Sequence, residues 1–230
     1  MKKILLGIFA IMSISTMAAN NGVNVYGRLG LDVYSHYNKY SQDVVDGDGD
    51  FFCTASIRDK GKMAPSIAIE VTKDLNSNFE VGLGIGYVSR GKRDYKEDFP
   101  DSGYYYEGKM PAINSIPLYL TGKYKFDTNS NVKPYIKADL GYSFNRMKNS
   151  FDVMVPGDGD TYPYNRVKAK NGLYTAIGLG VEYNNITADL SYVFTAAKVK
   201  TSGVVDEDEN RTLKANNSAI RLTVGYKFSF

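Results

Sequence analysis

Apolar and polar side chains alternate with a period of two along eight segments of this chain. Successive side chains of a β-strand point to opposite faces, so the alternation predicts strands with one apolar and one polar face. The predicted strands cover residues 23–34, 66–72, 79–87, 115–126, 136–144, 173–183, 186–194 and 220–230. These segments show no helical period, so we expect an all-β protein.

The connections between the predicted strands alternate in length. Three are short turns, at Lys73–Asn78, Asp127–Asn131 and Asn184–Asn185, and the other four run for about twenty residues or more. The two-residue turn supports the strand register, because such a hairpin places its flanking residues on one face, and Tyr183 and Ile186 both belong to the apolar set. Short turns at one end and long loops at the other are the layout of an outer-membrane barrel, with the long loops extracellular.

Aromatic residues gather where the predicted strands end. The chain has 19 Tyr and 11 Phe but no Trp. One group comprises Tyr87, Tyr142, Phe144 and Phe194, and the other comprises Phe79, Tyr124, Phe126, Tyr183, Tyr226 and Phe228. Two such groups are expected of the interfacial girdles of a membrane barrel. A soluble β-sandwich or ligand-carrying barrel would instead turn its apolar face inward. The sequence therefore predicts an eight-stranded antiparallel up-and-down transmembrane β-barrel.

The N-terminal segment has the three parts of a secretory signal peptide. Lys2 and Lys3 precede an apolar core over residues 4–12, and small residues follow over 13–19. Thr16 and Ala18 stand at the spacing that a signal peptidase reads, so we expect cleavage near Ala18 or Ala19. The apolar core is shorter than the ~20 residues that a membrane-spanning helix needs. Residues 1–19 are thus predicted to be a signal peptide and residues 20–230 the barrel domain.

Charge and cysteine content narrow the function classes. The formal net charge is +3, and it falls to +1 once Lys2 and Lys3 are removed. A nearly neutral protein is not expected to bind nucleic acid as its main role. Cys53 is the single cysteine and cannot form an internal disulfide. We expect no cofactor.

The C-terminal residues carry a resemblance to a known family. Residues 223–230 resemble the C-terminal signal of outer-membrane barrels through Thr223, Gly225, Phe228 and Phe230. Residues 116–120 and 133–142 are similar to strands of the small eight-stranded opacity-type and OmpA-like barrel superfamily. The resemblance implies recognition by the barrel-assembly machinery. Because no residue follows Phe230, we do not expect the periplasmic peptidoglycan-binding domain of full OmpA proteins.

The polar faces of the predicted strands carry both signs of charge. The inward acids are Asp32, Glu70, Glu80, Asp139, Glu182 and Asp189, and the inward bases are Arg28, Arg90, Lys123, Lys125, Lys137, Arg221 and Lys227. An eight-stranded barrel is just wide enough for side chains to fill it, and buried charges are tolerated when they are paired. The sequence predicts a paired plug, with a narrow conductive path as the alternative.

Catalysis and metal binding are both weakly supported. His36 is the only histidine, and its place in the alternation puts it on the inward face, next to Ser35. It is a candidate catalytic residue because some small outer-membrane barrels modify lipid A with a surface His, a Ser and an acid. Adjacent strand residues point to opposite faces, so Ser35 and His36 cannot form a dyad, although a Ser from another loop could serve. The Asp-Gly segments 46–50 and 157–160 have the acidic spacing of calcium loops, but Phe51 stands where that pattern needs a glycine. We expect neither an enzyme nor a metal site.

The long loops are rich in tyrosine, at Tyr104, Tyr105, Tyr106, Tyr162 and Tyr164. Tyrosine on surface loops suits adaptable contacts with other macromolecules. We expect a structural or surface-interaction role of the adhesion type, with lipopolysaccharide and a host or bacterial surface ligand as partners. The first alternative is a small passive pore, and the second is a lipid A-modifying enzyme.

Overall fold

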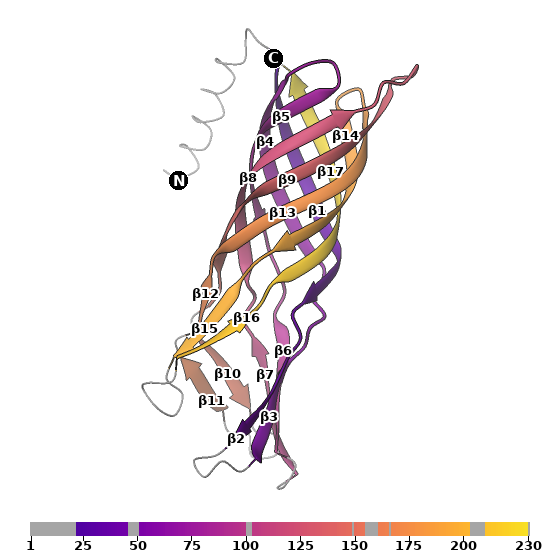
Figure 1. The fold of residues 1–230 in the computed structure, drawn as a ribbon. Helices are drawn as coiled ribbons and strands as arrows, with labels where there is room; N and C mark the ends of the chain where they lie inside the picture. Colours follow the sequence, from indigo (N-terminus) through magenta and orange to yellow (C-terminus); the bar gives the residue numbers. More distant parts are fainter. Residues whose placement is uncertain are drawn as a thin grey trace.

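Eight long strands close into a single barrel in the computed structural model (Figure 1). The structure describes residues 22–45, 51–99, 103–148, 150–154, 161–165, 167–202 and 210–229, so the predicted signal peptide and its cleavage site lie outside the described residues. The barrel strands are β1 (Val23–Tyr37), β4 (Ala64–Asp74), β5 (Phe79–Val88), β8 (Asn114–Lys125), β9 (Val132–Arg146), β13 (Gly172–Tyr183), β14 (Ile186–Thr195) and β17 (Asn217–Ser229). Each pairs with its neighbours in antiparallel fashion, and β1 closes the barrel on β17. The predicted fold is confirmed.

The alternation along each strand places the apolar side chains on the outer surface of the barrel and the polar ones on its inner surface. Leu29, Leu83, Leu120 and Leu179 point outward and are 67%, 57%, 61% and 65% exposed. A continuous apolar band of this kind is costly in water, whereas hydrocarbon accommodates it. The band therefore marks the lipid-facing surface. Among the described residues, no helix is long and apolar enough to cross a membrane.

Aromatic rings border the apolar band at both ends. Near the short turns, the rings of Tyr226 and Phe228 pack edge to face with centroids 4.7 Å apart, and both side chains are exposed. Near the opposite end, Tyr142 and Phe144 make the same kind of contact at 5.4 Å. Exposed aromatic side chains at these two levels suit the two membrane–water interfaces.

A β-bulge in β1 changes the orientation of its last residues. The register with β17 shifts between Asp32 and Tyr34, where the bulge inserts one extra residue into β1. The inward and outward positions are therefore reversed in the residues that follow. The alternation over residues 23–34 places Tyr34 on the inward face, but its side chain is 53% exposed. The predicted inward orientation of His36 is also wrong, since its side chain is 47% exposed and Ser35 is the buried neighbour.

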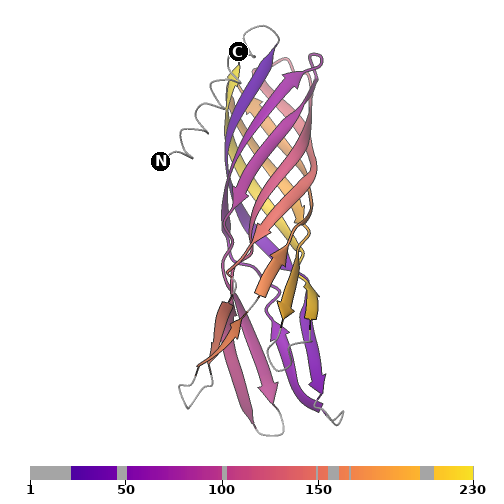
Figure 2. The same ribbon diagram turned by 90° about the vertical axis from the view of Figure 1, so that its left-hand side faces the viewer.

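The four long connections contain further strands, which the sequence analysis treated as loops. Among the described residues, a six-stranded sheet has the order β11-β10-β7-β6-β3-β2, and a three-stranded sheet has the order β12-β15-β16. Their bounds are β2 (Tyr40–Val45), β3 (Phe51–Ile57), β6 (Arg93–Phe99), β7 (Tyr104–Met110), β10 (Ser150–Met154), β11 (Thr161–Asn165), β12 (Val167–Lys170), β15 (Lys198–Ser202) and β16 (Asn210–Lys214). Figure 2 shows these strands continuing past one end of the barrel. We call the two sheets together the extension.

The extension has a hydrophobic core of its own. Ile57 and Met110 of the six-stranded sheet belong to one buried cluster with Val167 and Val199 of the three-stranded sheet. Ile113, which precedes β8, joins the same cluster next to the barrel mouth. Burying a side chain of this size stabilises a fold by about 1.5–3 kcal/mol. The two sheets are thus packed together outside the lipid-facing band.

Candidate functional site: the charged interior and the extension

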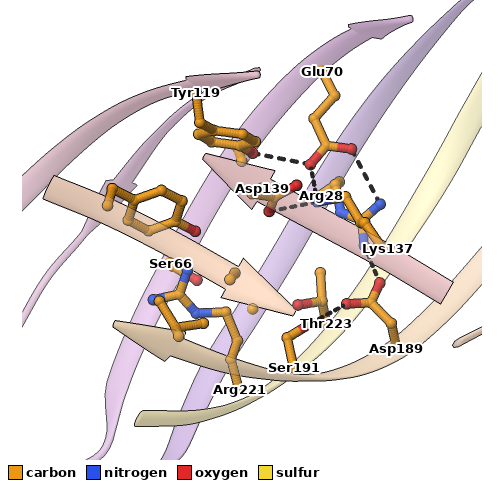
Figure 3. Close-up of a pocket in the computed structure, with 15 residues that line it drawn as sticks. Arg28, Ser66, Glu70, Tyr119, Lys137, Asp139, Asp189, Ser191, Arg221 and Thr223 are labelled. Atoms are coloured by element: carbon orange, nitrogen blue, oxygen red, sulfur yellow. Dashed lines mark hydrogen bonds and ion pairs between the residues drawn. The ribbon is translucent and has the colours of Figure 1, made fainter. Parts of the chain in front are cut away.

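The middle of the barrel holds a cluster of five charged side chains from four strands (Figure 3). Arg28 of β1 pairs with Asp189 and lies 3.3 Å from Glu70. The Lys137 Nζ atom lies 2.7 Å from Glu70 Oε1 and 2.8 Å from Asp139 Oδ2. All five side chains are buried. Each acid therefore has at least one cationic partner, which is the arrangement that makes buried charges tolerable.

Two buried tyrosines complete this central cluster. Tyr119 donates a hydrogen bond of 2.9 Å to Glu70, and Tyr135 donates one of 3.0 Å to Asp189. The Tyr135 ring lies against a glycine, since a Cβ atom placed on Gly180 would be 2.5 Å from its Cζ atom. Sequence reasoning did not single out these tyrosines, although their parity matches that of the inward charges.

Gly180→Ala is expected to destabilise the barrel by about 1–3 kcal/mol, because the added methyl group must displace the Tyr135 ring or a strand backbone. The measurement is the urea midpoint of the protein folded in lipid vesicles. Gly122→Ala is the matched control, since a Cβ at Gly122 meets no atom within 4 Å. The control is expected to be neutral or to stabilise by up to ~1 kcal/mol. Equal losses would contradict the close packing at Gly180.

A second cluster lies nearer the short turns. The Glu80 carboxylate forms ion pairs with Lys125 and Lys123, whose Nζ atoms lie 2.7 Å and 3.6 Å from its Oε2 atom. Glu182 pairs with Lys227 at 2.8 Å and lies 3.9 Å from Lys123. Lys123 thus bridges two acids in the buried interior.

A third cluster lies at the barrel mouth. Arg221 of β17 reaches Asp32 of β1 through two contacts, of 2.5 and 3.2 Å. Arg90 follows β5 and donates hydrogen bonds to the Ser115 hydroxyl at 2.5 Å and the Asn217 side-chain oxygen at 3.2 Å. Neutral oxygen atoms therefore hold Arg90 at this end of the interior.

Of the thirteen charged residues predicted to face the interior, twelve are buried and Lys227 is partly buried. Twelve of the thirteen lie within 4.0 Å of an opposite charge, and Arg90 is the exception within the described residues. The cavity that Figure 3 shows has a volume of about 30 Å³. That is room for roughly one or two water molecules.

The neighbourhood of His36 does not form a serine–histidine dyad with Ser35. The Ser35 hydroxyl is buried and accepts a hydrogen bond of 2.7 Å from Asn217. His36 points outward, with its Nδ1 atom 3.9 Å from the Asp59 carboxylate. The two side chains lie on opposite faces of β1. That this protein is not an enzyme stays a prediction.

Within the described part of the chain, no group of three or more His, Cys, Asp or Glu side chains could hold a metal ion. The Asp-Gly segments 46–50 and 157–160 lie outside the described residues, so the absence of calcium binding stays a prediction.

The predicted assembly signal is described except for its last residue. Thr223 is buried in the interior, whereas Phe228 is exposed among the aromatic side chains near the short turns. Gly225 lies where a Cβ would come 2.7 Å from the Thr187 hydroxyl. Phe230 lies outside the described residues. Recognition of this segment by the assembly machinery stays a prediction.

Comparison with known proteins agrees with this geometry. The model of the outer membrane protein beta-barrel domain family matches residues 4–228. The chain belongs to this family. It is therefore an outer-membrane protein of bacteria, and the lipid-facing band and girdles are those of an outer-membrane barrel.

Two relatives and one solved structure are similar to this chain. The uncharacterized protein PM1543 of Pasteurella multocida (strain Pm70) is 32% identical, over 99% of this chain and 98% of that protein. The outer membrane protein PagN of Salmonella typhimurium (strain LT2) is 26% identical, over 82% of this chain and 80% of that protein. The crystal structure of the outer membrane protein OprG from Pseudomonas aeruginosa shares the fold, with a TM-score of 0.50 and 16% identity over 91% of this chain and 97% of that one.

Proposed function

We propose that this family member is a surface-interaction protein of the adhesion type. The barrel anchors it in the outer membrane, and the extension is its recognition surface. The observation that carries the proposal is a contrast between the barrel interior and the extension. The interior is filled by paired charges, whereas the part outside the membrane forms two sheets packed on a common hydrophobic core. Recognition surfaces are commonly placed on such connections of a rigid scaffold.

The outer face of the six-stranded sheet offers polar and aromatic contacts. A groove of about 280 Å³ is lined by residues that include Lys39, Arg58 and Lys96. The Lys96 Nζ atom lies 4.9 Å from the centroid of the exposed Tyr105 ring. Hydrogen bonds from Arg58 and Lys109 lower the pKa of Asp94, which keeps this carboxylate charged between the two bases. An aromatic ring next to alternating charges suits a polar macromolecular ligand.

Tyr105→Ser is expected to weaken attachment to the bound surface by about tenfold or more, because exposed tyrosines of recognition surfaces often carry a large share of the binding energy. Replacing residues 149–166 by a short turn removes the edge hairpin β10–β11 and should also weaken attachment. The measurement is the retention of bacteria that express each variant on host cells, extracellular matrix and other bacteria.

Leu75→Ser is the matched control for attachment, since Leu75 is an exposed residue of a short turn at the opposite end of the barrel. The control should attach like the unchanged protein. If both extension variants attach as well as the control, the extension is not the recognition surface and the proposal fails.

The folded protein is expected to show no steady current in planar lipid bilayers, because the interior charges pair with each other and leave a cavity of only about 30 Å³. Single-channel recording of the purified barrel is the measurement. A large, steady and reproducible conductance would show a pore and would contradict the paired plug.

A further inference from the structure

One face of the three-stranded sheet consists largely of lysine. Lys168 and Lys170 of β12 alternate with Val167 and Ala169, which are buried in the extension core. Lys198 and Lys200 of β15 flank the buried Val199 in the same way, and Lys214 of β16 follows the half-buried Leu213. Four of the five lysines are exposed, and Lys200 is partly so. We call these five residues the lysine face.

The register places these lysines directly opposite one another. Lys168 pairs with Lys200, Lys170 pairs with Lys198, and Lys198 pairs with Lys214 across the next ladder. Strands β12, β15 and β16 contain no Asp or Glu. Like charges directly opposite each other destabilise a sheet. A sheet that carries three such pairs is therefore stabilised by any anion that sits between them.

The lysine face begins where the lipid-facing surface ends. Lys170 stands two residues before the start of β13, Lys198 three residues after the end of β14, and Lys214 three residues before β17. At about 3.3 Å per residue, these three lysines lie within roughly 10 Å of the barrel rim. The exposed Tyr192 and the half-buried Phe194, near the end of β14, mark the interface at that level. Figure 1 shows the three strands directly beyond the barrel strands that they continue.

We propose that the lysine face binds the phosphate groups of lipopolysaccharide molecules in the outer leaflet around the barrel. The height of Lys170, Lys198 and Lys214 matches the headgroup layer, where the phosphates of lipid A lie. A polyanion of another cell would approach from the distal end of the extension instead. In the sequence, the acidic run Asp206–Glu209 lies between β15 and β16. The lipid site is independent of the proposed attachment role.

The test compares two triple variants. Lys170→Gln, Lys198→Gln and Lys214→Gln together remove the membrane-proximal part of the lysine face. Lys60→Gln, Lys62→Gln and Lys92→Gln remove three exposed lysines beside β4 and β5, which lie across the barrel from β13 and β14 in the strand order. The two variants therefore lose the same charge at opposite sides of the mouth.

The probe is purified bisphosphorylated lipid A in phosphatidylcholine vesicles, with fully dephosphorylated lipid A as the reference. We expect the unchanged protein to prefer the bisphosphorylated form and to lose this preference at high salt. A lysine near an anionic membrane surface contributes about fivefold in affinity, so the first triple variant should bind on the order of 100-fold more weakly. The control variant should change by less than about threefold.

A second measurement separates binding from folding. In neutral detergent without lipid A, the first triple variant should melt at the same temperature as the unchanged protein or higher, because like-charge pairs have been removed. Bisphosphorylated lipid A should then raise the melting temperature of the unchanged protein but not that of the variant. Equal affinity in the variant and the unchanged protein, or equal losses in the two triple variants, would overturn the proposal. So would a first triple variant that still binds lipid A but no longer binds soluble heparin, which serves here as a probe for a polyanion of another cell.

Discussion

Glu70→Ala is expected to destabilise the folded barrel by about 3–5 kcal/mol, because Arg28 and Lys137 each lose one of their two acidic partners in the buried interior. The Tyr119 hydroxyl loses its acceptor in the same substitution. The chain has no Trp, so unfolding by urea in lipid vesicles is best followed by circular dichroism and by the heat-dependent shift of the folded band on gels.

Asp98→Ala provides the control for Glu70→Ala. Asp98 pairs with Lys96 at 2.9 Å on the exposed surface of the extension, where an ion pair contributes at most about 1 kcal/mol. Adding Lys137→Met to Glu70→Ala should lower the stability further, since it removes the cationic partner of the buried Asp139. If Glu70→Ala cost no more than Asp98→Ala, the interior would not be the paired network that the structure shows.

Leu83→Arg is expected to cost about 2–4 kcal/mol, the usual penalty for a cation near the middle of the lipid-facing surface of a barrel. Leu83 lies in the middle of β5, opposite Val71 and Leu120, and is 57% exposed. The measurement is the yield of folded protein in vesicles, together with the free energy of unfolding.

Leu75→Arg is the matched control for this substitution. Leu75 is 60% exposed but lies in the turn between β4 and β5, where the new charge can reach water. The control should therefore fold with nearly unchanged yield. Equal losses from the two substitutions would mean that the apolar band does not face lipid.

The barrel was predictable from the sequence because its two surfaces have opposite chemistry. Leu83 faces lipid and Glu80 faces the interior, so a single alternating pattern reveals both the strand and its orientation. The bulge in β1 escaped prediction because an extra residue leaves the alternation intact on each side. In the structure the bulge appears as two consecutive outward residues, Val33 and Tyr34.

The interior was only partly predictable. Parity placed the charged side chains inside, but it could not pair them, because partners come from strands that are distant in the sequence. Arg28 and Asp189 are 161 residues apart and meet across the interior. The extension was missed for a related reason. Its strands are four to seven residues long, so the alternation of Val167 to Lys170 is too short to separate from a charged loop.

The strand order of the six-stranded sheet links the extension to barrel closure. Strands β2 and β3 come from the connection between β1 and β4, β6 and β7 from that between β5 and β8, and β10 and β11 from that between β9 and β13. These hairpins become neighbours once β4, β5, β8 and β9 have paired, since such long-range contacts form only after the intervening chain is ordered. The exposed sheet is thus a product of correct insertion. A barrel that stalls during assembly would present three separate hairpins to the cell exterior, open to surface proteases and without a shared epitope.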